Sequence, residues 1–420
     1  MDKRSFIKKM GLATIASPFY ASALPSLMDS VAGISSFELA SNEDFWSKVR
    51  HDYKLKPDYI NLESGYYNII PTPTLNRMID HVKMVNYEGS YYMRTVQWEN
   101  KKRMTEKLAK VVGSTSKNII ITRNTTESLD MVIKGMSWEE GDEAIMAIQD
   151  YGAMKRMFRQ VSERYGVVIN KVSIPNHPKS DEELLALYRD AITEKTKLLM
   201  VCHMINITGH ILPIKKICDM AHERGVQVMV DGAHCVGHFE FNIEDLGCDY
   251  YGSSLHKWLA VPLGTGLLYV KDEHIDTLWP IFAESKREPG DISRLNHTGT
   301  HPVYHDLTIE DAIEYYNMLG PARKEARLRY LQQYWTSQVR ELPRIRVNTP
   351  SDPERACGIA NVGIEGIKPA ELATRLLEEY NIFTVAIDFA NVQGCRITPN
   401  VFTQIEELDV FVRALKELAA

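Results

Sequence analysis

An acid and a lysine follow short apolar segments near the middle of this sequence. The apolar run 226–230 stops at Asp231, and a second strand-like segment, 249–253, leads to Lys257. A lysine side chain can form a Schiff base with a carbonyl group, and burial lowers its pKa enough to make the amine nucleophilic. Lys257 is therefore our candidate for the catalytic residue.

The segments around these two residues indicate where they lie in a fold. Apolar runs as short as 226–230 and 267–270 are typical of parallel strands that are covered on both faces. Ligands of such sheets bind outside the carboxyl ends of the strands. Asp231 and Lys257 both stand at such ends, so we expect them at one binding site.

The residue types at this site fit one cofactor. Lys257 can bind an aldehyde, and a carboxylate such as Asp231 can keep a pyridine nitrogen protonated. Ser254 and His256, beside the lysine, can bind a phosphate. Aldehyde, ring nitrogen and phosphate are the functional groups of pyridoxal 5′-phosphate (PLP), which we predict as the cofactor. The alternative is that Asp231 caps a turn and Lys257 is an ordinary surface lysine. That interpretation is adequate for each residue alone, but it does not explain why the acid, the lysine, Ser254 and His256 occur together.

The same residues carry a resemblance to a known family. The motif DGAH at 231–234, followed by SLHK at 254–257, resembles the signature of class V aminotransferase-fold PLP enzymes, most nearly their isopenicillin N epimerase-like branch. The resemblance extends over most of the chain after about Tyr59. It implies an α/β protein of PLP-dependent transferase fold type I. Such a protein has a large domain with a mostly parallel sheet between helices, and a small α+β domain. The resemblance also implies that His234 contacts the cofactor.

Another segment predicts further phosphate contacts. The strand-like run 118–122 is followed by Asn124 and an apolar-periodic helix, and Glu127 stands at the spacing of a capping box. The free N–H groups at the start of a helix favour an anion, and the hydroxyls of Thr125 and Thr126 add donors. The segment resembles the phosphate loop of the family, although a plain helix cap has a similar sequence.

The resemblance assigns roles to residues in three other loops. Tyr151 corresponds to the aromatic residue that stacks on the pyridine ring, and Asn206 to the asparagine that contacts the phenolic oxygen of the cofactor. The loop 63–68 corresponds to one that lies over the active site. The alternatives are a core tyrosine, a turn asparagine before Gly209, and a surface loop.

Two positions in the last third of the chain imply a partner subunit and a substrate group. Thr300 corresponds to a Gly-Thr that reaches the phosphate of the partner subunit's cofactor, which implies a homodimer with shared sites. Arg396 corresponds to the arginine that binds the substrate α-carboxylate, and a planar guanidinium suits a carboxylate. The alternatives are a Gly/Thr turn and a surface salt bridge.

Apolar patterns predict the elements that position these residues. Strand and helix patterns alternate as far as Asp231, which favours a largely parallel sheet. A long helical pattern, 309–342, is interrupted at Gly320-Pro321. The last helix is expected to start with a capping box of Thr403 and Glu406. The predicted strands are 59–62, 118–122, 144–148, 167–172, 197–202, 226–230, 249–253, 267–270, 381–385 and 394–399, and a charged helical pattern covers 78–112.

The predicted organisation has four parts. Residues 1–25 form an export signal, 26–58 a linker and N-terminal segment, 59–290 the large PLP-binding domain, and 291–420 the interdomain helices and the small C-terminal domain.

The export signal is predicted from the first residues. The basic start KRSFIKK at 3–9 precedes an apolar stretch, and small residues at 21–23 fit a cleavage site. The start resembles a twin-arginine signal with lysine in the first position, so the general secretory route stays open. We expect export to the periplasm, or a cytoplasmic location if the leader is not functional.

Composition limits the partners. The 420 residues carry a net charge of −6 with mixed signs and form no basic tract, which argues against nucleic acid. The sequence has no run of about 20 apolar residues, so no permanent membrane span is expected. The six cysteines form no Cys-x-x-Cys pair, and we expect buried thiols rather than disulfides or zinc ligands. No metal site is predicted.

The expected substrate is a small amino-acid-like molecule that reacts through a Cα carbanion. Reprotonation on the opposite face gives an epimerase, which the resemblance favours. Reprotonation at the cofactor gives an aminotransferase, and loss of a β-substituent gives a lyase. A cysteine desulfurase is disfavoured because the loop 386–394, before Arg396, contains no cysteine. An exported enzyme that tailors a peptide natural product is a further alternative. A non-catalytic descendant is another, but the presence of both Lys257 and Asp231 argues against it.

Overall fold

The computed structural model describes residues 24–284 and 288–420. The predicted leader, 1–25, lies outside the described residues except for its last two positions, so export stays a prediction. Within the described ranges, every helix is too short or too polar to cross a membrane.

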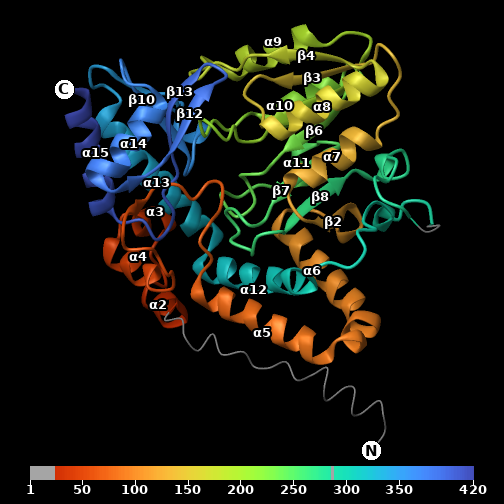
Figure 1. The fold of residues 1–420 in the computed structure, drawn as a ribbon, viewed down its shortest axis with the longest axis horizontal. Helices are drawn as coiled ribbons and strands as arrows, with labels where there is room; N and C mark the ends of the chain where they lie inside the picture. The colour runs from red at the N-terminus through yellow and green to blue at the C-terminus, as the bar shows by residue number, and fades with distance from the viewer. Residues whose placement is uncertain (1–23, 285–287) are drawn as a thin grey trace, which may run out of the picture.

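A seven-stranded sheet forms the centre of the larger lobe (Figure 1). Its strands are β2 (Ile119–Thr122), β3 (Glu143–Ala147), β4 (Val168–Val172), β5 (Thr196–Cys202), β6 (Gln227–Asp231), β7 (Tyr250–Ser254) and β8 (Gly266–Val270). They lie in the order β2-β8-β7-β6-β5-β3-β4. Only β8 runs antiparallel to its neighbours. The prediction of a largely parallel sheet is therefore confirmed.

Helices cover both faces of this sheet. Successive strand residues point to opposite sides, and both sides carry apolar residues that must be buried. Leu198 and Met200 of β5 belong to an apolar cluster with α7 and α8, whereas Leu199 and Val201 belong to a cluster with α6, α9, α10 and α12. The helices of this lobe are α5 (Thr72–Glu88), α6 (Gln97–Val111), α7 (Thr125–Gly135), α8 (Gly152–Tyr165), α9 (Asp181–Ala191), α10 (Ile214–His222), α11 (Ile243–Leu246) and α12 (Val303–Leu319). The predicted helical stretch 78–112 is divided by a π-helical turn, Tyr92–Val96.

The smaller lobe is a sheet packed against helices, the α+β arrangement that was predicted, and its strands are antiparallel. Its strands lie in the order β12-β13-β10-β9. The elements are β9 (Ile345–Val347), β10 (Ala360–Ile364), β12 (Val385–Phe389), β13 (Val392–Ile397), α13 (Pro321–Val339), α14 (Pro369–Tyr380) and α15 (Ile405–Ala419). The predicted break at Gly320-Pro321 separates α12 from α13.

The capping box predicted at Thr403 and Glu406 is wrong by one residue. The reciprocal pair is formed by Gln404 and Glu407. The hydroxyl of Thr403 instead accepts a hydrogen bond from the Asn400 amide at 2.9 Å.

Residues 24–50 are helical and packed, which differs from the linker expected over 26–58. The segment forms α2 (Leu24–Ser30), α3 (Ser36–Ala40) and α4 (Glu43–Arg50), and Trp46 is only 1% exposed. Buried Arg327 of α13 donates to the Glu43 carboxylate, with one N–O distance of 2.9 Å, and to the Ala40 carbonyl. A short parallel pair, β1 (Ile60–Asn61) with β11 (Ile382–Phe383), then joins the following segment to the small lobe.

Glu43→Ala tests whether this N-terminal segment stabilises the fold. The change leaves the buried Arg327 guanidinium without its carboxylate, and breaking a buried pair costs about 3–5 kcal/mol. Because Glu43 is itself about one-third exposed, we expect a smaller loss, about 1–3 kcal/mol, measured as a lower urea midpoint.

Lys48→Ala is the matched control. It removes an exposed pair with Asp44 on the same helix, and exposed pairs contribute less than about 1 kcal/mol. Equal midpoints for the Glu43 variant and the wild type would show that the segment contributes little to stability.

Candidate active site

A cavity of about 220 Å³ lies at the carboxyl edge of the large sheet. Segments that follow β2, β3, β5, β6 and β7 all reach it, as the sequence predicted for ligands of a parallel sheet. The lining residues are Tyr66, Tyr67, Asn124, Thr125, Thr126, Tyr151, Met154, Cys202, Met204, Asn206, Asp231, Ala233, His234, Ser254, His256 and Lys257.

Lys257 lies in the turn after β7 and is partly buried. Its Nζ lies 3.0 Å from Nε2 of His234. The indole N–H of Trp258 donates to Nδ1 of the same imidazole at 3.3 Å. Burial lowers the pKa of Lys257 to about 8, against a raising effect of Asp231. A substantial fraction of this amine is therefore neutral near physiological pH, which a nucleophilic lysine needs.

Asp231, the last residue of β6, is 5% exposed. One carboxylate oxygen accepts the Ala233 amide at 3.0 Å. Burial raises the pKa of Asp231, although that hydrogen bond and Lys257 lower it. Among the described residues, no side-chain nitrogen of a lysine, arginine or histidine forms an ion pair with the Asp231 carboxylate at an N–O distance of 4.0 Å or less. A buried carboxylate of this kind suits a ligand that brings its own cation, such as a protonated pyridine nitrogen.

The predicted phosphate-binding residues lie together. Asn124 caps α7 by accepting the Glu127 amide at 2.9 Å. Ser254 accepts the Thr125 amide at 3.0 Å, and the two hydroxyls lie 2.7 Å apart. Nδ1 of His256 is buried without a partner among the described residues, and burial lowers the pKa of this imidazole to about 4. A helix start, two hydroxyls and a free ring nitrogen fit a phosphate.

Tyr151 and Asn206 reach the cavity from two other loops. Tyr151 is the residue before α8 and is 43% exposed, so it is no core tyrosine. Asn206 is buried in the turn after β5. Together with the groups above, the cavity offers donors for a phosphate, an acid for a ring nitrogen and an amine for an aldehyde. The residues therefore fit PLP.

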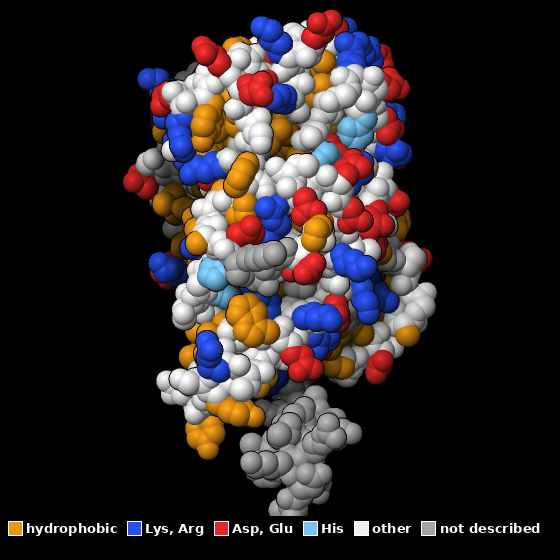
Figure 2. Space-filling model, turned by 90° about the vertical axis from the view of Figure 1, so that its right-hand side faces the viewer, with side chains coloured by type: hydrophobic (Ala, Val, Ile, Leu, Met, Phe, Trp, Pro, Cys, Tyr) orange, Lys and Arg blue, Asp and Glu red, His pale blue; other side chains and the backbone are white. Residues whose placement is uncertain are grey.

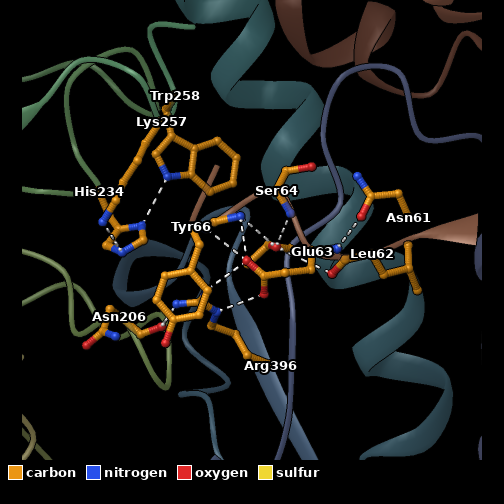
Figure 3. A network of polar contacts seen from close by, with 12 residues as sticks. Asn61, Leu62, Glu63, Ser64, Tyr66, Asn206, His234, Lys257, Trp258 and Arg396 are labelled. Atoms are coloured by element: carbon orange, nitrogen blue, oxygen red, sulfur yellow. Dashed lines mark hydrogen bonds and ion pairs between the residues drawn. The ribbon is translucent and has the colours of Figure 1, made fainter. Parts of the chain in front are cut away.

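Arg396 has a different environment from the one that the sequence suggested. Its guanidinium donates to both carboxylate oxygens of Glu63, at 3.0 and 2.7 Å, and the ring of Tyr66 lies 3.9 Å from it (Figure 3). A third nitrogen donates to the Asn206 carbonyl at 3.2 Å. In the described part of the chain, neither Arg396 nor Glu63 lines the cavity.

Thr300 is exposed and lines a different depression of about 840 Å³, which Trp98 and His301 also line. It does not reach the cavity of its own chain. Its predicted role concerned a partner subunit's cofactor, so that role stays a prediction.

The sequence predicted that the loop 63–68 lies over the site, and Tyr66 and Tyr67 do line the cavity. Sequence reasoning missed two other contributions, those of Glu63 and Trp258. It did not identify Glu63 as the partner of Arg396, because 333 positions separate them. It also gave Trp258 no role, although the indole adjoins the SLHK motif and orients His234.

The six cysteines are all buried and free, as expected. Cys202 lines the cavity, and burial raises the pKa of its thiol well above the usual range. Outside the cavity, ligand atoms of Asp249, Glu273 and His274 lie within 4.8 Å of one another. The sequence had not suggested that group, and His222 and His274 already contact the Asp249 carboxylate.

Known proteins share this fold, with 20–26% of the aligned residues identical in three of them. Isopenicillin N epimerase of Streptomyces clavuligerus is 26% identical over 394 residues, covering 89% of this chain and 98% of that protein. Cysteine desulfurase of Haloferax volcanii is 23% identical over 358 residues, covering 80% of this chain and 82% of that protein. A solved structure of a C-DES mutant, with glycine covalently linked to its PLP cofactor, matches with a TM-score of 0.79. It is 20% identical and covers 87% of this chain and 98% of its own.

The match to a family extends through both lobes. Residues 70–388 match the model described as Aminotransferase class-V. With the mostly parallel sheet, this confirms fold type I and PLP as the cofactor. The chain belongs to the class V aminotransferase family of PLP-dependent enzymes.

Proposed function

We propose that this enzyme removes and returns the proton on the carbon that carries the substrate's amino group, in the manner of an epimerase. The observation that carries the proposal is Lys257, an amine with a lowered pKa in a cavity that the buried acid Asp231 also lines. PLP, when bound, draws electrons from the amine-bearing carbon and makes its proton acidic. The residues of the chain then need only bind, orient and exchange a proton.

Lys257 is the proposed base, and its neighbours favour the neutral amine. An indole nitrogen only donates, so Nδ1 of His234 must accept from Trp258. Burial lowers the pKa of His234 well below its usual range, so the imidazole is neutral. Its one proton is then on Nε2, which faces Nζ of Lys257 at 3.0 Å. An N–H aimed at Nζ requires a lone pair there, which only the neutral amine has.

One observation supports the epimerase, and a second argues against a desulfurase. The relative with this activity aligns over nearly the whole of its own length. A desulfurase needs a reactive thiolate, and burial raises the pKa of Cys202, the one cysteine at the cavity within the described residues, well above its usual range. An aminotransferase or a β-lyase would use the same base: the first would return the proton at the cofactor, and the second would lose a β-substituent.

We also propose export and a homodimer. Export is supported by the basic start and apolar stretch before Leu24, and sequencing the N-terminus of the protein from its native cell tests it.

The dimer is supported by an exposed apolar surface on α5 and α6 near the loop of Thr300. Figure 2 shows apolar side chains on this side of the molecule, among charged ones. The exposed apolar residues of these helices and the turn between them include Ile79, Val82, Tyr87, Tyr91 and Trp98.

Lys257→Ala should abolish covalent attachment of the cofactor and all exchange of substrate Cα hydrogen in deuterated water. The measurements are borohydride fixation with peptide mapping, and NMR over a panel of amino acids and their amides. Inversion without a keto acid indicates an epimerase, keto-acid-dependent conversion an aminotransferase, and release of ammonia a lyase.

Lys324→Met is the control for that variant, because Lys324 is also buried, with its pKa lowered to about 7, but does not line the cavity. It should keep the adduct on Lys257. An adduct on any lysine other than Lys257 would refute the assignment.

The lowered pKa of Lys257 predicts a pH dependence of cofactor capture by the cofactor-free protein. Only the neutral amine attacks the aldehyde. The capture rate should therefore rise about tenfold per pH unit below about 8 and level off above it.

Trp258→Phe tests the role of the indole. The change frees His234 to change tautomer and should move the midpoint of the capture profile upward by about one pH unit. Trp279→Phe, an exposed control, should leave the profile unchanged; an equal shift in both variants would argue against the role of Trp258.

Trp98→Glu tests the dimer. Trp98 is 65% exposed, and a charge in a buried apolar interface is strongly unfavourable. Light scattering should give the mass of two chains for the wild type and of one chain for the variant. A monomeric wild type that is fully active would exclude shared sites.

A further inference from the structure

A buried ion pair lies directly behind the wall of the cavity. The side chains of Arg396 and Glu63 are 0% and 4% exposed. Tyr66 and Asn206, which both contact the Arg396 guanidinium, line the cavity themselves. A carboxylate that enters the cavity therefore meets the tyrosine ring and the asparagine before it meets the arginine.

Both carboxylate oxygens of Glu63 accept hydrogen bonds. One oxygen accepts from Arg396 at 2.7 Å and from the amides of Gly65 and Tyr66 at 2.9 Å each. The other oxygen accepts from Nε of Arg396 at 3.0 Å. A planar guanidinium and a carboxylate joined by two parallel hydrogen bonds form the geometry that a substrate carboxylate would otherwise adopt at this arginine.

The backbone around Glu63 is fixed as well. Glu63 forms a parallel bridge with Thr398, and the amides of Ser64 and Gly65 donate to the Thr398 hydroxyl at 2.7 and 3.0 Å. If Glu63 moved away, the Tyr66 amide would lose its acceptor, the Gly65 amide would keep only the Thr398 hydroxyl, and a buried carboxylate would need a new partner. Breaking one side of a buried pair is strongly unfavourable. A substrate carboxylate would have to compensate for all of these losses.

We infer that Glu63 takes the place of a substrate carboxylate at Arg396, so that this enzyme acts on an amino compound whose carboxyl group is not free. The substrate class is an amino-acid amide or the N-terminal residue of a peptide. A neighbouring carbonyl keeps the Cα proton acidic in both, without a charge to be neutralised. Tyr67 and Tyr151, exposed by 68% and 43%, show that the cavity is open to the surface, where a peptide chain could continue. The inference rests on the proposed function.

The first test compares matched substrates on the wild-type holoenzyme. L-Alanine and L-alaninamide, L-leucine and L-leucinamide, and the dipeptide L-alanyl-glycine are incubated in deuterated water, and loss of the Cα proton is followed by NMR. We expect kcat/KM for the amides and the dipeptide to exceed that for the free acids by about 100-fold or more. This comparison needs no variant, so it does not depend on how a mutant folds.

The second test uses Glu63→Gln, which keeps the shape of the side chain but removes its charge. The unpaired guanidinium should then attract carboxylates. The ratio of kcat/KM for the amides to kcat/KM for the free acids should fall at least tenfold. In calorimetry, propionate should bind to the cofactor-free variant but not to the cofactor-free wild type. Glu43→Gln is the control, because Glu43 pairs with another buried arginine, Arg327, away from the cavity. It should leave both the ratio and propionate binding unchanged.

The outcomes separate the two proposals. Free acids that exchange as fast as amides on the wild type overturn the inference and leave the proposed function standing. An unchanged ratio in the Glu63 variant, with no propionate binding, also overturns the inference. Exchange with neither class of substrate refutes the proposed function and, with it, the substrate class.

Discussion

The Arg396–Glu63 pair is the interaction on which the arrangement of the site depends. It joins β13 of the small lobe to the loop after β1, and through the Asn206 carbonyl it also holds the turn after β5 of the large lobe. The loop that it fixes carries Tyr66 and Tyr67 into the cavity wall. Both charges are buried, so each is stable there only because the other is present. The pair therefore sets the position of the small lobe relative to the cavity and also the charge that a substrate meets.

The second constraint is the burial of Lys257. Desolvation favours the neutral amine, and the contact of Nζ with Nε2 of His234 acts in the same direction. The charge of Asp231, which lines the same cavity, opposes this effect. The opposition explains why the pKa of Lys257 is lowered only to about 8 rather than further. A lysine in this range is reactive toward an aldehyde and still basic enough to take a proton from carbon.

The sequence was informative where a role depends on neighbours in the chain. Asp231 and Lys257 end strands whose apolar runs are visible in the sequence, and the edge on which they meet follows from parallel pairing. It was uninformative where a role depends on distant contacts. Glu63 has no local signal for its pairing with Arg396, and the helices of residues 24–50 are held by tertiary contacts such as Arg327 with Glu43. The cap of the last helix was misplaced because the Thr403 hydroxyl is used by Asn400.

Ionisation of the site and binding of the cofactor are coupled. Burial raises the pKa of Asp231, and it raises that of Asp150, a nearby carboxyl, to about 7. The charge of Asp231 contributes to the raised pKa of Asp150, whereas the Ala147 amide, the Cys202 thiol and the charge of Lys155 lower it. Asp231 would hold a protonated pyridine nitrogen, and that positive charge would favour the ionised form of this acid. A ligand that binds only the folded chain adds its binding free energy to the stability of the fold. Through Asp231, the proposed chemistry and the stability of the fold would then both depend on the cofactor.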